Sequence, residues 1–314
     1  MKTKTLLVTA LGALALIGCD AEFDPGSNVS SLRVLSVRAD NPYAAPGETV
    51  TFEATSYDPD GRDIEWAWVA CETPASGSVD GCLVEIAETA SATGTIPLLA
   101  NGVGQNSVEL SIPANVLDGV PAEARPSVFS GVLSIACPGS LSLDVEAAAQ
   151  GGSLLPFVCT DPSGAELGLH DAIAGVKRVY IRETDRNQNP VIDNITFDGE
   201  PWAEDDVKEV DSCDIGDFTF DDCKGDGDHR IAAHLTPESF ETGTDEFGRD
   251  FTEELVVQHY ATEGIFEYEV RIGEEPETRW VARRSASGQE LRLWFVARDD
   301  RGGVTLAERR VRVR

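Results

Sequence analysis

Positive charge is scarce in this sequence. Its 314 residues include 25 Lys and Arg against 55 Asp and Glu, which gives a formal net charge of −30. Such a field repels nucleic-acid phosphates and anionic lipid headgroups. We therefore expect no nucleic-acid partner.

Long apolar runs are absent as well. The longest extends over twelve residues, Leu6 to Ile17, whereas a helix that crosses the hydrocarbon core of a bilayer needs about 20. It follows Met-Lys-Thr-Lys and precedes Gly18 and Cys19, which is the basic, apolar and small-residue order of a secretory signal. We predict a cleaved signal peptide at residues 1–18.

The end of this signal, Leu16-Ile17-Gly18-Cys19, resembles the lipobox of bacterial lipoproteins. The resemblance implies a diacylglycerol thioether on Cys19 and a further acyl chain such as palmitate, and two or three chains anchor a protein stably where one does not. An ordinary signal peptide with a chance cysteine is the alternative. Asp20 resembles the inner-membrane retention signal of enteric bacteria, but that rule varies between bacterial groups, and we favour the outer membrane or cell surface.

Residues 19–30 are polar, contain Pro25 and Gly26, and predict a short lipidated tether. At about 3.3 Å per residue this tether reaches some tens of ångströms at most, so the folded part is expected close to its membrane. Loss of residues 1–18 removes Lys2 and Lys4 and no acidic residue, leaving 23 basic against 55 acidic residues.

Catalytic signatures are missing. The sequence has no HExxH, GxSxG, GxxxxGK[ST] or strand–GxGxxG–helix pattern, and its four histidines (His170, His229, His234 and His259) form no recognisable nucleophile–base pair. His259 lies in a candidate strand and is expected to be packed rather than catalytic. Among 55 acidic residues, close carboxylate pairs arise by accident. We predict a protein that is not an enzyme, with a hydrolase using unrecognised carboxylates as an alternative.

Six cysteines remain once Cys19 is lipidated, and an even number in an exported protein favours disulfides. Six cysteines allow 15 connectivities. Proximity along the chain suggests Cys71–Cys82, Cys137–Cys159 and Cys213–Cys223. A metal site would need CxxC spacing with nearby histidines, which none of the six shows.

From Leu32 onward the dominant period is two, which is typical of half-buried antiparallel strands. Clear examples are the alternations that begin at Val50, Ile64 and Val108, with a bulge expected near Leu35. Further strands are predicted at 131–137, 176–181, 193–197, 230–235, 255–260, 265–272, 279–282, 291–297 and 304–313. No long amphipathic helix is expected, and Ala165 to Gly175 supplies at most a turn or two.

Two series of short strands predict an all-β protein with two tandem immunoglobulin-like β-sandwich domains at 31–182 and 183–314. Gly47 to Val69 resembles the opening of a PKD or related immunoglobulin-like domain, and Leu291 to Arg314 resembles the closing hairpin of such domains. The sequence from Trp66 to Cys71 departs from the Gly-Asp-Gly loop that commonly follows the PKD tryptophan. The layout is similar to surface lipoproteins of the myxobacterial type.

Acidic residues gather around Cys213 and Cys223. Calcium takes 6 to 8 oxygen ligands, several of them carboxylates, so a calcium site is one hypothesis for Asp214, Asp217, Asp221, Asp222, Asp226 and Asp228. The spacing does not match the Asp-x-Asp-x-Asp-Gly loop, and a solvated acidic loop is the alternative. A second candidate is the domain junction, with Glu183, Asp185, Asn187, Asn189 and Asp193, where a polar hinge that satisfies turn backbone is favoured over calcium.

Exposed tryptophans would suggest carbohydrate binding. Trp66 lies two residues after Ile64, on the same face of its strand, and is expected in the core. Trp294 lies on the opposite face of its strand from Leu291, and it is expected to be exposed unless its sheet is covered on both faces. The sequence thus favours a lipid-anchored envelope protein that serves as an adhesion, spacer or assembly module, with an envelope protein or polysaccharide as partner. The alternative is a calcium- or glycan-binding module of a polysaccharide-handling system.

Overall fold

A computed structural model describes residues 26–71, 79–144, 157–168, 171–213, 220–223, 227–244 and 249–314. Cys19 and the signal peptide lie outside these residues. None of the helices in the described part of the chain has the length and apolarity needed to cross a membrane.

The first half of the chain forms a sandwich of two sheets. The three-stranded sheet has the order β1 (Arg33–Ala39), β3 (Thr49–Tyr57), β6 (Ser107–Ser111). The five-stranded sheet has the order β2 (Tyr43–Ala44), β10 (Ile173–Ile181), β7 (Phe129–Cys137), β4 (Glu65–Cys71), β5 (Leu98–Val103). Neighbours are antiparallel except β2, which runs parallel to β10.

The second half repeats this arrangement. One sheet has the order β12 (Glu200–Pro201), β11 (Ile192–Phe197), β15 (Asp228–Leu235), β21 (Glu277–Arg283), β14 (Ser212–Cys213), with β19 (Ile265–Phe266) also on β21. The other has the order β13 (Val207–Val210), β23 (Val304–Val313), β22 (Glu290–Arg298), β18 (Val256–Ala261), β20 (Val270–Ile272). Here β13 runs parallel to the last strand, β23, as β2 does to β10.

The two sandwiches therefore share one topology. In the first sandwich β1 pairs with β3, and the short strand β2 lies in the other sheet, where it runs parallel to the last strand, β10. In the second sandwich β11 pairs with β15, and the short strand β13 lies in the other sheet, where it runs parallel to the last strand, β23. This is an immunoglobulin-like β-sandwich order, and it confirms the all-β, immunoglobulin-like fold predicted from the strand pattern.

Smaller elements decorate the sandwiches. They are the helices α1 (Val79–Thr93) and α3 (Phe220–Cys223), the hairpins β8 (Ser140–Leu143) with β9 (Phe157–Thr160) and β16 (Thr242–Thr244) with β17 (Asp250–Thr252), and 3₁₀ turns at Arg125–Ser127, Pro237–Ser239 and Arg284–Ala286.

The apolar residues that alternate along the strands point into the cores. Val50, Phe52 and Ala54 of β3 are at most 1% exposed and pack with Trp66 and Trp68 in the core of the first sandwich. A separate core fills the second sandwich. The predicted bulge in β1 is present, because its register on β3 shifts between Val34 and Ser36.

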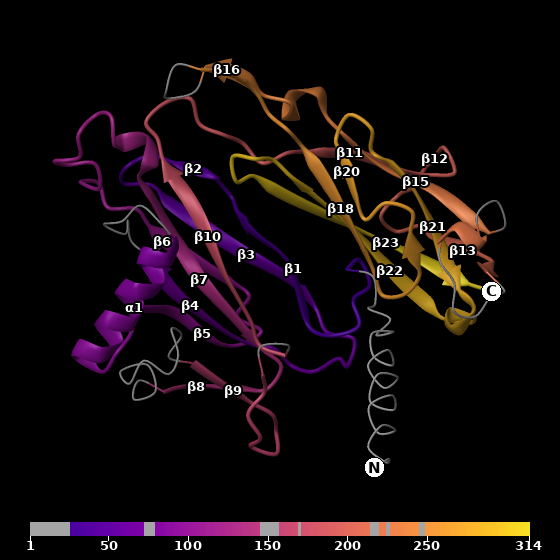
Figure 1. The fold of residues 1–314 in the computed structure, drawn as a ribbon, viewed down its shortest axis with the longest axis horizontal. Helices are drawn as coiled ribbons and strands as arrows, with labels where there is room; N and C mark the ends of the chain where they lie inside the picture. The colour runs from indigo at the N-terminus through magenta and orange to yellow at the C-terminus, as the bar shows by residue number, and fades with distance from the viewer. Residues whose placement is uncertain are drawn as a thin grey trace, which may run out of the picture.

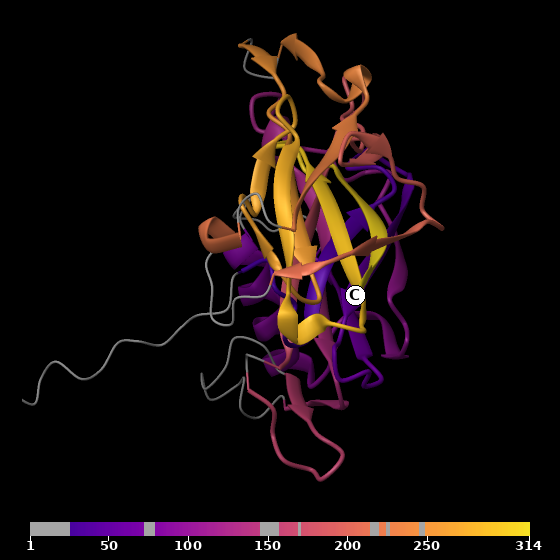
Figure 2. The same cartoon turned by 90° about the vertical axis from the view of Figure 1, so that its right-hand side faces the viewer.

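The two sandwiches stack face to face. Figure 1 shows four sheets in succession across the molecule, with the three-stranded β1 sheet next to the sheet that contains β22 and β23. Figure 2, turned by 90°, shows the second sandwich in front of the first. The inner two sheets are therefore in contact where β1 meets β23, whereas Glu53 of β3 and Glu109 of β6, on the same face of the three-stranded sheet, are exposed.

Helix α1 contradicts the expectation that the chain has no long helix. Cys82, Ile86 and Ala90 recur every four residues and are at most 3% exposed, so a narrow apolar stripe packs on the outer face of the five-stranded sheet. The helix ends at Gly94, whose φ of 71° provides a left-handed cap. Because only three small or medium side chains form this stripe, the helical periodicity is weak in the sequence.

Residues 165–175 supply no more than a turn where the structure describes them, as expected. The carbonyl of Gly168 accepts from the backbone of Asp171 and of Ala172, and Ile173 to Gly175 belong to β10. One other expectation was wrong. The strand expected over 265–272 is interrupted, because β19 pairs with β21 in one sheet and β20 pairs with β18 in the other. The chain crosses between sheets at this point, which period-two alternation does not reveal.

Candidate functional site

The contact between the two sandwiches is centred on Trp294. This side chain is 1% exposed and packs with Val29, Leu35 and Tyr57, whose ring centroid lies 4.9 Å from that of Trp294. Its indole Nε1 donates a hydrogen bond of 2.8 Å to Glu308. The tryptophan that is out of phase in β22 therefore serves the domain interface and is unavailable for carbohydrate stacking.

Charged side chains extend this interface. The guanidinium of Arg298 donates to the carbonyl of Leu35 over 2.8 Å and to Gln258 over 2.9 Å, so one arginine bridges the two sandwiches. Lys177 of β10 donates to the carbonyl of Gly302 in the second sandwich. Burial, with the charge of Arg298 as a smaller cause, lowers the pKa of Lys177 to about 8.

The segment that precedes the first sandwich is attached to the second one. Ala261 of β18 donates to the carbonyl of Ser27, and Val29 donates back to the carbonyl of Ala261. Ser27 also donates from its hydroxyl to Glu269 over 3.1 Å, and it is 2% exposed. The described chain thus begins wedged between the sandwiches.

The linker between the sandwiches is a polar hinge. Asn189 donates to the carbonyls of Ala39 and Asp40 at 2.8 and 3.1 Å, and its Oδ1 accepts from the backbone of Val304 at 2.9 Å. Asn187 donates to Asp299 over 3.1 Å. These amides bind backbone and side chains of both sandwiches, as the polar-hinge interpretation requires.

The remaining junction residues do not converge on a cation. Asp185 accepts from Thr184, and Asp193 accepts from Asn194, each from its own neighbour. Within the described ranges no group of three or more His, Cys, Asp or Glu side chains is placed to hold a metal ion.

Arg301 organises the polar side of the junction. Its Nη1 donates to Glu241 at 3.0 Å and to Glu253 at 3.1 Å, and its guanidinium lies 4.6 Å from the ring centroid of Phe251 and 5.1 Å from that of Tyr43. Glu253 is 4% exposed. Burial, and then the charges of Asp299 and Glu241, raise the pKa of Glu253 to about 7.

A cleft of about 750 Å³ opens beside this cluster. Four arginines line it, Arg182, Arg186, Arg249 and Arg301, and so do the acidic residues Asp185, Glu241, Asp250 and Asp300. Because the Tyr43 and Phe251 rings already contact the Arg301 guanidinium, a ligand in this cleft would meet a mixed polar wall instead of free aromatic faces.

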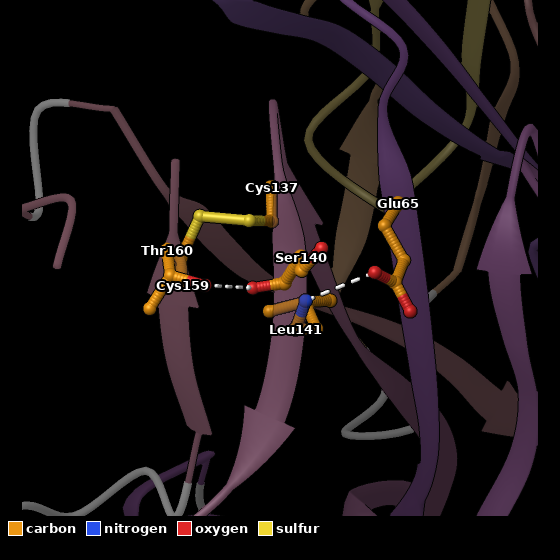
Figure 3. Close-up of a disulfide and its surroundings, with 6 residues drawn as sticks. All are labelled: Glu65, Cys137, Ser140, Leu141, Cys159 and Thr160. Atoms are coloured by element: carbon orange, nitrogen blue, oxygen red, sulfur yellow. Dashed lines mark hydrogen bonds between the residues drawn. A yellow bond between two sulfur atoms is a disulfide. The ribbon is translucent and has the colours of Figure 1, made fainter. Parts of the chain in front are cut away.

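The cysteines pair as neighbours along the chain. The structure contains Cys71–Cys82, Cys137–Cys159 and Cys213–Cys223, with Cα–Cα distances of 5.6, 5.8 and 5.9 Å. The first ties α1 to β4. Figure 3 shows the second, which fastens the β8–β9 hairpin to the end of β7, while the backbone of Leu141 donates to Glu65 of β4 over 2.9 Å. The third ties α3 to β14.

The proposed calcium ligands lie mostly outside the described residues. Asp214, Asp217 and Asp226 are not described, nor are the side chains of Asp221 and Asp222. Asp228 is described, and its carboxylate accepts from Arg279 over 3.0 Å. The same arginine also contacts Glu267 at 2.7 Å, so Asp228 belongs to an ion-pair network next to the disulfide.

The histidines occupy structural positions where they are described. His259 is 1% exposed, and burial lowers its pKa to about 4, so it is neutral near pH 7. His229 contacts Asp198 at 2.8 Å, and His234 contacts Thr196 at 3.2 Å. His170 lies outside the described residues. The five tryptophans are all described and at most 2% exposed, so none offers a platform for sugar rings.

No family model and no curated protein matches this chain. Among solved structures it is similar to the tandem Ig repeats of Dlar, at 9% identity, 90% coverage of this chain, 97% coverage of that chain and a TM-score of 0.26. It is also similar to the three N-terminal domains of the bacteriophage RB49 highly immunogenic outer capsid protein, at 8% identity, 90% coverage of this chain, 59% coverage of that chain and a TM-score of 0.22. A third similar structure is the D0-D1 domain of intimin, at 11% identity, 89% coverage of this chain, 98% coverage of that chain and a TM-score of 0.21. TM-scores this low add nothing to the fold assignment, which rests on strand order.

Proposed function

We propose that this chain is a lipid-anchored envelope protein whose two sandwiches form one stiff adhesion, spacer or assembly unit. The observation that carries this proposal is the way the sandwiches are joined. A buried tryptophan, two bridging cations and an asparagine hinge connect them along their faces. Tandem domains that touch only through a linker are expected to move independently, whereas a buried apolar contact with hydrogen bonds around it holds two domains together.

The anchor itself is inferred from the sequence. Only residues 20–25 separate the proposed acceptor Cys19 from the first described residue, Gly26, so a lipid on Cys19 would place this rigid body within about 25 Å of a bilayer. The disulfides suit an oxidising compartment outside the cytoplasm.

Metabolic labelling with a palmitate analogue tests the anchor. The wild-type chain should acquire label and partition with membranes, and Cys19→Ser should lose both while keeping its three disulfides. Ser27→Ala, a change in the same segment that leaves the acceptor intact, is the matched control and should remain labelled. An unlabelled wild-type chain would overturn the lipoprotein assignment.

Calcium binding by the acidic loop is the second candidate function. The Cys213–Cys223 disulfide supports it, because it fixes both ends of the segment that carries most of the acidic residues named above. Calcium, but not magnesium, should then raise the melting temperature, and D217N/D221N should remove the shift. A melting temperature indifferent to calcium at millimolar concentration would exclude the site.

A further inference from the structure

Strand β5 forms an exposed edge of the five-stranded sheet of the first sandwich. It is the last strand in the order β2-β10-β7-β4-β5. Leu98, Leu99 and Val103 are 38%, 37% and 64% exposed, which is unusual for three large apolar side chains in one six-residue strand. A Cβ atom added at Gly102 would meet nothing within 4 Å, so the sheet face is open at this position of the strand.

Strand β5 and its neighbours along the chain carry no charge. From Thr89 to Val108 the sequence contains no acidic or basic residue, although charged residues make up 25% of the chain. On the adjacent strand β4, Glu65 lies opposite Val103, and its carboxylate accepts from the backbone of Leu141. Natural proteins block exposed sheet edges with charged side chains, which prevent pairing with other chains. The other edge strands of three or more residues in the described sandwiches, β1, β6, β13 and β20, each contain at least one charged residue. Strand β5 lacks this protection.

The strip is symmetrical about its centre. In the register on β4, Asn101 lies opposite Ala67 and Val103 opposite Glu65, which places Asn101 and Val103 on the outer face of the sheet. Leu99 is exposed two residues before Asn101, next to the bulge where the register of β5 on β4 shifts between Trp68 and Val69. In an antiparallel pair of β5 strands centred on Asn101, Leu99 of each copy would face Val103 of the other, and the two Asn101 amides would meet.

We propose that β5 is the site where a second copy of this chain pairs, edge to edge and antiparallel. A chain with a net charge of −30 repels its own copies wherever acidic residues face each other, and an uncharged edge is where that repulsion is weakest. A two-fold interface must also be complementary to itself, as the Leu99–Asn101–Val103 strip is. The five strands of each copy then continue as one sheet. This dimer does not depend on the lipid anchor.

Two double variants test the pairing and its register. L99K/V103K places lysine opposite lysine across the two-fold axis, whereas L99K/V103E places lysine opposite glutamate. Sedimentation equilibrium of the full-length protein in density-matched detergent should show a dimer for the wild type. The dimer should be weakened at least about tenfold in L99K/V103K and regained in L99K/V103E, since opposite charges stabilise a cross-strand pair and like charges destabilise it.

Ile272→Lys on β20 is the matched control, because Ile272 is 45% exposed on the corresponding edge strand of the second sandwich, and it should leave the dimer unchanged. In an independent measurement, Asn101→Cys should form a disulfide-linked dimer in intact cells and Ile272→Cys should not, because facing residues of paired strands lie within disulfide reach. A monomeric wild type, equal weakening by both double variants, or loss of the dimer in Ile272→Lys would each overturn the proposal.

Discussion

Replacing Trp294 by alanine is expected to uncouple the two sandwiches without unfolding either of them. The side chain is 1% exposed, yet it belongs to the small cluster with Val29 and Leu35 and to neither sandwich core. Truncation of a buried tryptophan costs about 3–5 kcal/mol. Here most of that loss should fall on the coupling between the sandwiches.

Differential scanning calorimetry measures this coupling. The wild type should unfold in one transition, and W294A in two, because each sandwich keeps its own core. Small-angle scattering should show a larger radius of gyration for the variant. W294F retains an aromatic ring but loses the Nε1 hydrogen bond to Glu308, a loss of about 1.5–3 kcal/mol for a bond to a charged group, and its effect should be intermediate.

Trp280→Ala provides the comparison. Trp280 is also fully buried, but it lies in the core of the second sandwich, so its truncation should lower the stability of that sandwich itself. If W294A unfolded in a single transition at the wild-type midpoint, the stacked interface could not be what makes the protein one rigid unit.

Three further outcomes follow from the same contacts. Asn189→Ala removes hydrogen bonds to both sandwiches and should cost about 1–3 kcal/mol, measured by urea unfolding, whereas Asn194→Ala at an exposed position should be neutral; equal effects would refute the hinge assignment. Burial raises the pKa of Glu253 from 4.5 to about 7, so between these pH values the folded state retains a proton that the unfolded state releases. The free energy of unfolding should therefore fall as the pH rises from about 4.5 to about 7. Glu253→Gln should reduce this pH dependence, and an unchanged pH dependence would contradict the assignment. C71A/C82A should release α1 from β4 and increase amide exchange in residues 79–93, with an unchanged exchange rate counting against the disulfide as its attachment.

The strands could be predicted from the sequence where one face is buried and the other is wet. Val50, Phe52 and Ala54 alternate with polar residues, and they are the buried residues of β3. In β22 this rule fails, because Leu293, Trp294, Phe295 and Val296 are all at most 1% exposed. A strand that is buried on both faces has no alternation of apolar and polar residues, so its sequence does not show what packs on the second face.

The junction could be predicted only in part. Asn and Asp residues near Pro190 indicate a polar connection between the sandwiches, and residues 186–191 do lie in an irregular segment there. That Asn189 would bind the carbonyl of Ala39, 150 residues earlier, and that Arg301 would meet Glu253 depend on how the sandwiches stack. Local sequence carries no signal for such contacts. The cysteines were different, since pairs 10 to 22 residues apart form short loops.

The shared topology explains why α1 and the β8–β9 hairpin are present in only one sandwich. In the second sandwich, the outer face of the β22 sheet packs at Trp294 against the three-stranded sheet of the first. Within the described ranges, no further sheet packs on the equivalent face of the first sandwich, which contains β7, yet every residue of β7 is buried. Helix α1 and the hairpin cover it, and a disulfide fastens each to that sheet. These two additions end the stack, as capping units do in repeat proteins, and β5, the edge strand of the same sheet, is the strand that we propose for pairing with a second copy.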